Sequence, residues 1–163
     1  MTATATLGTL PEWNLADLYE GPAAPALLAD VKTSEADAAA FAKAWKGKLA
    51  KASGPGLATA LKTYEAMNDL IGRIGSYAQL YYVGDTTDAA RAKFYGDTNA
   101  RITEISTQLL FFELEFNRIP DAALAKALKT PALAHYRPWI DNLRMEKPYQ
   151  LEDKLEEDRK SVV

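Results

Sequence analysis

Two neighbouring stretches decide the fold: Ile71-Gly-Arg-Ile-Gly-Ser-Tyr-Ala-Gln-Leu-Tyr-Tyr-Val-Gly-Asp85-Thr-Thr-Asp88 and Gln108-Leu-Leu-Phe-Phe-Glu-Leu-Glu-Phe-Asn117. The first stretch closes a long apolar pattern with Gly, Asp and Thr, which are residues of helix ends and turns. The second stretch is the aromatic end of another long pattern. Because only a few residues separate the two patterns, the sequence predicts two long helices that form an antiparallel hairpin.

The spacing of apolar and small residues supports both helices. In each helix they recur at alternating steps of three and four, which is the spacing of a helix-bundle seam. In the helix expected at about 57–83 these positions are Leu57, Leu61, Tyr64, Asn68, Ile71, Gly75, Ala78 and Tyr82. In the helix expected at about 88–117 they are Tyr95, Thr98, Ile102, Ile105, Leu109, Phe112 and Phe116.

The first hairpin helix contains small residues at Gly72, Gly75 and Ser76. A glycine inside a helix costs about 1 kcal/mol relative to alanine, so these positions need a compensating contact. Close approach of another helix would supply it. We therefore expect a helix crossing here, and a large side chain at Gly75 should destabilise the fold by several kcal/mol.

The rest of the chain completes an all-α prediction. An alanine-rich amphipathic pattern indicates a third long helix at about 25–50, packed on the hairpin. After Pro120 the elements shorten, and a charged helix is expected at about 151–160. We expect a flexible N-terminal segment at 1–12, an apolar anchor at 13–19 and a single helical domain over 13–163.

Composition excludes several classes of function. The net charge of -3 argues against nucleic acid as a partner, since such proteins usually carry a basic face. The sequence has no cysteine, which excludes disulfides and thiolate sites. It shows no secretory signal at its start and no apolar run long enough to span a membrane. We therefore expect a cytoplasmic protein that binds neither nucleic acid nor membrane.

Side chains that could carry chemistry are scattered. His135 is the only histidine, and its neighbours supply no further metal ligands. Glu113 and Glu115 point to different sides of a helix, so they cannot share one site, and one of them could pair with an arginine such as Arg73 or Arg101. Acids in a threonine-rich turn, as at 85–88, are more often helix caps than metal ligands. The sequence therefore predicts no catalytic residue and no metal ligand.

Aromatic residues gather near the expected hairpin tip. Tyrosine is favoured at interfaces, so they could form a platform for a peptide or another domain. They could equally be core, and the sequence leaves both interpretations open. The residues concerned are Tyr77, Tyr81, Tyr82, Phe94 and Tyr95.

Several segments, in order, resemble the N-terminal helical region of oligoendopeptidase F, a zinc metallopeptidase of the thimet-oligopeptidase-like group. The resemblance covers most of the chain. Its main segments are Leu10-Pro-Glu-Trp-Asn-Leu-Ala-Asp-Leu-Tyr19, Arg73-Ile-Gly-Ser-Tyr-Ala78, Asp85-Thr-Thr-Asp88, Leu110-Phe-Phe-Glu-Leu-Glu115, Tyr136-Arg-Pro-Trp-Ile-Asp-Asn-Leu-Arg144 and Leu151-Glu-Asp-Lys-Leu-Glu156.

The resemblance implies a structural role. In that family this region forms one wall of a deep channel for short peptides and packs over the catalytic domain that binds zinc. The H-E-x-x-H motif of that domain is absent from these 163 residues, so no metal ligand or general base can be assigned to this chain, which we expect to be inactive alone. The alternatives are a free-standing helical interaction module and a bundle that dimerises. The apolar stripe Leu151, Leu155 and Val162 makes self-association a further expectation.

Overall fold

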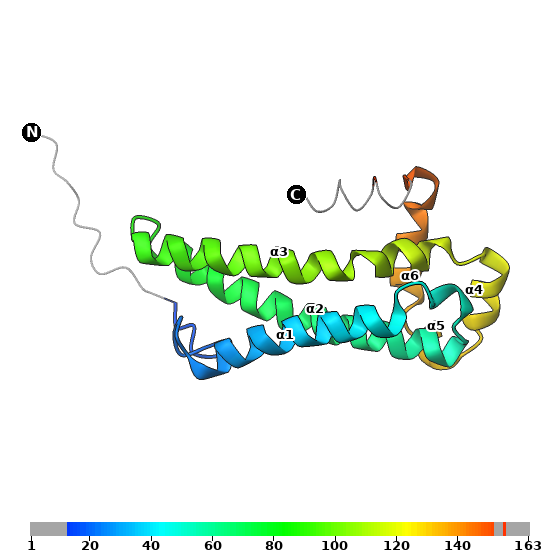
Figure 1. Ribbon diagram of the computed structural model, residues 1–163, viewed down its shortest axis with the longest axis horizontal. Coiled ribbons are helices and arrows are strands. Elements are labelled where there is room, and N and C mark those ends of the chain that lie inside the picture. Colours follow the sequence, from blue (N-terminus) through cyan, green and yellow to red (C-terminus); the bar gives the residue numbers. More distant parts are fainter. Residues whose placement is uncertain (1–12, 152–154, 156–163) are drawn as a thin grey trace, which may run out of the picture.

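The structure, a computed structural model, describes residues 13–151 and residue 155. Three long helices lie side by side, and several short helices gather at one end of them (Figure 1). The long helices are α1 (Pro25–Trp45), α2 (Gly54–Val83) and α3 (Ala89–Arg118). The described residues contain no strand, so the all-α prediction is confirmed.

The hairpin of α2 and α3 forms as the sequence predicts. The Ser53 side chain caps α2 by accepting a hydrogen bond from Gly56 N. Asp88 caps α3 in the same way, because its carboxylate accepts from the N–H groups of Ala90 and Arg91. Each cap satisfies N–H groups that have no partner inside the helix. The prediction that the acids of this turn are caps is confirmed at Asp88.

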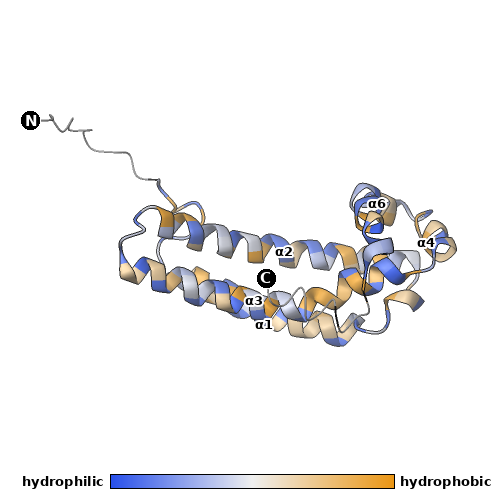
Figure 2. Cartoon of the chain, turned by 90° about the horizontal axis from the view of Figure 1, so that it is seen from above, coloured by the Kyte–Doolittle hydropathy of each residue, from blue (hydrophilic) through white to orange (hydrophobic). Residues whose placement is uncertain are grey.

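The core lies along the inner faces of the three long helices. Figure 2 shows hydrophobic and hydrophilic residues alternating along the long helices, as is typical of helices with one buried face. At the centre of the larger cluster, Phe41 of α1 lies 5.3 Å from the ring of Phe112 in α3. The Phe112 ring in turn stacks on Tyr64 of α2 at 4.4 Å. Aromatic contacts of this kind bury large areas, and they join all three helices here.

α1 is shorter than the sequence predicts. It ends at Trp45 instead of continuing to about residue 50, and a short 3-10 helix, η1 (Leu49–Lys51), follows. Gly47 has a φ of +76°, a left-handed conformation that glycine adopts most readily. The Gly47 N–H donates a hydrogen bond to Glu115 Oε1 at 2.7 Å. The chain therefore turns at Gly47, and α3 holds the turn in place.

An N-terminal anchor closes the opposite end of α1. The Tyr19 ring is buried, and its hydroxyl donates a hydrogen bond to Asp30 Oδ2 at 2.7 Å. Arg73 of α2 donates to Leu18 O at 2.7 Å and lies over the Tyr19 ring at 4.7 Å. Burial, and then the bond to Asp30, raises the pKa of Tyr19 to about 12.

The short helices at the other end are α4 (Asp121–Ala127), α5 (Pro131–Ala134), α6 (Arg137–Met145) and the 3-10 helix η2 (Lys147–Tyr149). Arg144 of α6 fastens them to the end of α3. Its guanidinium donates to Asn117 O at 2.5 Å and to Ile119 O at 2.8 Å, and it also pairs with Asp121. One side chain therefore satisfies carbonyl groups that the end of a helix leaves without partners.

Some predictions cannot be compared with the structure. The N-terminal segment 1–12 lies outside the described residues, as does most of the helix expected at 151–160. Within the described ranges, no helix combines the length and the apolar character needed to cross a membrane.

Candidate functional site

The aromatic residues near the hairpin tip divide into an inner and an outer group. Tyr77 is buried and belongs to the second core cluster, together with Tyr19 and Ile74. Tyr81 is half-buried and stacks on Tyr77 at 5.9 Å. Phe94 of α3 meets the edge of both rings, at 6.0 Å from Tyr77 and 5.7 Å from Tyr81. Tyr77, Tyr81 and Phe94 therefore hold α2 and α3 together near their turn.

The outer group consists of Tyr82 and Tyr95. Their rings are nearly parallel, with an interplanar angle of 6° and centroids 5.1 Å apart. Both are half-buried, so part of each ring contacts solvent. A stacked pair at the surface can receive a third flat group, and it also joins the two helices without any ligand.

The small residues of α2 lie in different environments. A Cβ added at Gly75 would lie 3.3 Å from Ile102 Cδ1, so α3 is close at this point. A Cβ added at Gly72 would meet nothing within 4 Å, and Ser76 is exposed. The argument from a close helix crossing therefore applies to Gly75, whereas Gly72 and Ser76 are on the outer side of α2.

The two glutamates of the aromatic run have structural partners. Tyr64 donates a hydrogen bond from its hydroxyl to Glu113 Oε1 at 3.1 Å, and burial followed by this carboxylate raises the pKa of Tyr64 far above its ordinary value. Glu115 receives the Gly47 N–H. Arg73 is engaged with Leu18 instead. The sequence therefore failed to identify Tyr64 and Gly47 as partners, because both lie far away along the chain.

No metal centre can be built from the residues that the structure describes. They contain no group of three or more His, Cys, Asp or Glu side chains that could hold a metal ion. His135 is exposed, and its ring contacts that of Tyr136 at 5.1 Å. Asp85 accepts hydrogen bonds from the Thr87 N–H at 3.0 Å and the Thr87 hydroxyl at 2.7 Å, and these bonds lower its pKa. These side chains therefore do not fit a zinc site.

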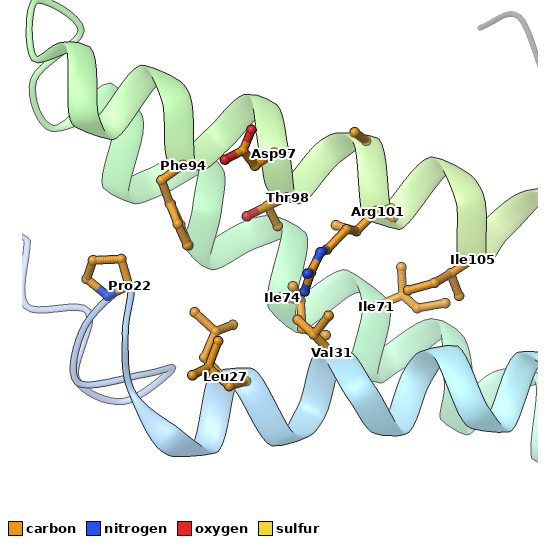
Figure 3. A pocket seen from close by; sticks show the side chains of 13 residues that line it. Pro22, Leu27, Val31, Ile71, Ile74, Phe94, Asp97, Thr98, Arg101 and Ile105 are labelled. Atoms are coloured by element: carbon orange, nitrogen blue, oxygen red, sulfur yellow. The ribbon is translucent and has the colours of Figure 1, made fainter.

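A groove opens between α1 and α3, with α2 as its floor (Figure 3). Its volume is about 470 Å³, which lies within the range of about 300–1,000 Å³ that is usual for small-molecule sites. Asp97, Thr98 and Arg101 of α3 form its polar edge. The other lining side chains are mostly apolar, among them Leu27, Val31, Ile74, Phe94, Ile102 and Ile105. The sequence contains one signal of this groove, namely Thr98 within an otherwise apolar seam.

A second surface feature lies at the end with the short helices. Large apolar side chains are exposed there, with 73% of Met145 and 82% of Tyr149 accessible to solvent. Leu151 and Leu155 are also about half exposed. Large apolar side chains exposed in one stretch of the chain can mark a surface that contacts another protein.

Residues 115–157 match a family model, which is described as Oligopeptidase F. This chain resembles the N-terminal region of that peptidase. The matched segment begins in the last turn of α3 and continues through α4, α5, α6 and η2, so it includes Arg144, Met145 and Tyr149. No curated protein and no solved structure matches the chain. The resemblance to oligopeptidase F seen in the sequence is therefore confirmed over residues 115–157.

Proposed function

We propose that this chain forms a wall of the substrate channel of a zinc-dependent oligopeptidase F that hydrolyses short peptides. The observation that carries the proposal is the family match over residues 115–157. The shape of the fold supports it as well. α2 and α3 have 30 residues each, which at 1.5 Å per residue gives stiff rods of about 45 Å. A wall selects its substrates by shape and needs no reactive side chains.

In this proposal the catalytic domain supplies the zinc ligands and the general base. This chain supplies a surface for that domain, and we assign the contact to Met145, Tyr149, Leu151 and Leu155. Three arguments favour these side chains. They are the large apolar residues exposed around α6 and η2, they lie within the family match, and Arg144 fixes the helix that carries Met145.

The test is co-elution of the chain with a separately expressed catalytic domain of an oligopeptidase F. We expect a complex from the wild-type chain, and no complex when Met145 and Tyr149 are both replaced by Asp. The matched control is Val83→Asp, because Val83 is also an exposed apolar residue, 47% accessible, but lies at the hairpin tip. Failure of the wild-type chain to bind, or equal loss in the control, would contradict the proposal.

Self-association is the second use of the same apolar side chains, and the exposure of Met145 and Tyr149 favours it as well. Light scattering over a concentration series separates the two functions. A mass that doubles with concentration and returns to that of one chain in the double Asp variant would indicate a dimerising module. A constant mass of one chain, together with co-elution, would support the channel wall.

A further inference from the structure

The groove between α1 and α3 has a polar edge that the fold does not use. Thr98 is buried, with 8% of its surface accessible, and it lines the groove. Threonines elsewhere on α3 donate to the carbonyl four residues earlier, as Thr103 does at 2.9 Å and Thr107 at 2.8 Å. Among the described residues, Thr98 has no such partner. The Thr98 hydroxyl can therefore donate a hydrogen bond to a molecule in the groove.

Arg101 follows Thr98 by three residues, so the two side chains lie on the same side of α3. Figure 3 shows Arg101 extending from α3 into the groove, toward Ile74 and Val31. The acid four residues earlier, Asp97, does not neutralise it, because Asp97 pairs with Lys93 at 2.7 Å. Within the described part of the chain, Arg101 makes no ion pair. A guanidinium therefore lies over an apolar floor with its donors available.

We propose that this groove binds a small apolar molecule that carries one carboxylate. Arg101 offers the planar pair of donors that fits a carboxylate, and Thr98 offers a third donor beside it. The apolar body of the ligand would cover Leu28, Phe94 and Ile102, which line the groove and are exposed or half-buried, and it would displace water from them. An amine of the same length is disfavoured, because Arg101 would repel it and the Asp97 carboxylate at the same edge is paired with Lys93.

This chemistry is shared by a free fatty acid and by the C-terminal residue of an apolar peptide. Both have an apolar body next to a single carboxylate. The proposal is independent of the proposed function, since all residues that line the groove lie between Pro22 and Ile105, outside residues 115–157.

The experiment is calorimetric titration of the full chain with octanoate and, separately, with octylamine. We expect octanoate to bind at one molecule per chain and octylamine to bind at least tenfold more weakly. Acetyl-leucyl-leucine and its C-terminal amide form the second pair of ligands. Binding of the peptide acid but not of the amide would show that a peptide terminus also fits, and binding of octanoate alone would limit the site to fatty acids.

Variants test whether the ligand occupies this groove. Arg101→Met keeps the apolar stem of the side chain and should weaken octanoate binding at least tenfold. Thr98→Val should weaken it several-fold, and Ala100→Phe, which adds bulk at the groove, should abolish it. Arg137→Met on α6 is the matched control, because this arginine is exposed and does not line the groove.

The thermal unfolding of each variant, followed by circular dichroism, checks that the fold is intact. Three results would overturn the proposal. They are the absence of octanoate binding to the wild-type chain, equal binding of octanoate and octylamine, and unchanged binding in folded Arg101→Met.

Discussion

Leucine at Gly75 should destabilise the protein relative to leucine at Gly72, although the two glycines lie three residues apart in α2. The reason is their surroundings. A Cβ at Gly75 would already lie 3.3 Å from Ile102 Cδ1, and the rest of a leucine side chain needs more room. At Gly72 nothing lies within 4 Å of the added Cβ. The pair therefore isolates the effect of helix packing from the effect of removing a glycine.

The magnitude follows from two terms. Replacing a helical glycine by a good helix former stabilises by roughly 0.8–1 kcal/mol at either position. At Gly75, leucine must also displace Ile102, and overpacking costs about 1–3 kcal/mol. The first term cancels between the variants, so the free energies of unfolding should differ by about 1–3 kcal/mol. Relative to wild type, Gly75→Leu should lose at most about 2 kcal/mol, which is less than the sequence alone predicts.

Urea unfolding followed by circular dichroism measures this difference. Gly72→Leu should unfold at a higher urea concentration than wild type, and Gly75→Leu at a lower one, with similar slopes for both transitions. Gly75→Ala should lie between them, because its single methyl group needs only a small shift of Ile102. Equal midpoints for the two leucine variants would show that α3 does not approach α2 at Gly75, and would refute the packing argument.

Three further outcomes are expected from urea unfolding. Gly47→Ala should lower the free energy of unfolding by about 1–2 kcal/mol, because alanine adopts the positive φ of this position less readily. Gly96→Ala should raise it, because Gly96 lies inside α3 with open space around it. Equal effects of the two substitutions would contradict this reasoning. Arg144→Met should lower the free energy of unfolding by about 2–3 kcal/mol, because the charged hydrogen bonds to the end of α3 disappear. An unchanged urea midpoint would show that water replaces these bonds fully. Stability should fall as the pH rises from 10 toward 12, because the pKa of Tyr19 is 10.0 when unfolded and about 12 when folded. Tyr19→Phe should reduce that fall, and the same slope in this variant would assign it to other groups.

The long helices could be predicted from the sequence because their signals are local. Alternating steps of three and four predict which side chains turn inward, and every seam position named on α3 is buried or half-buried. On α2 the pattern is wrong at Asn68, which is exposed, whereas its neighbour Met67 is buried. The start of α3 follows from Asp88, which caps it as predicted, whereas α2 begins at Gly54 behind the Ser53 cap, three residues before the predicted start. The hairpin also follows directly, since a short turn between two helices of equal length leaves few other arrangements.

The features that the sequence did not predict depend on contacts between distant residues. The turn at Gly47 is held by Glu115, 68 residues later, and Tyr136 donates a hydrogen bond to Glu65 across 71 residues. The groove is lined by residues of α1, α2 and α3, and no local pattern encodes how these three helices meet. Thr98 is an example. The sequence predicts its position in the seam of α3, but only the packing of α1 beside α3 shows that Thr98 lines the groove.

The bond between Gly47 and Glu115 has a consequence for the order of folding. α2 and α3 are neighbours along the chain and can close into a hairpin early, since nearby segments lose little entropy on meeting. Glu115 is then already positioned before the N-terminal third arrives. We expect α1 to dock last, with the turn at Gly47 closing over a carboxylate that the finished hairpin presents.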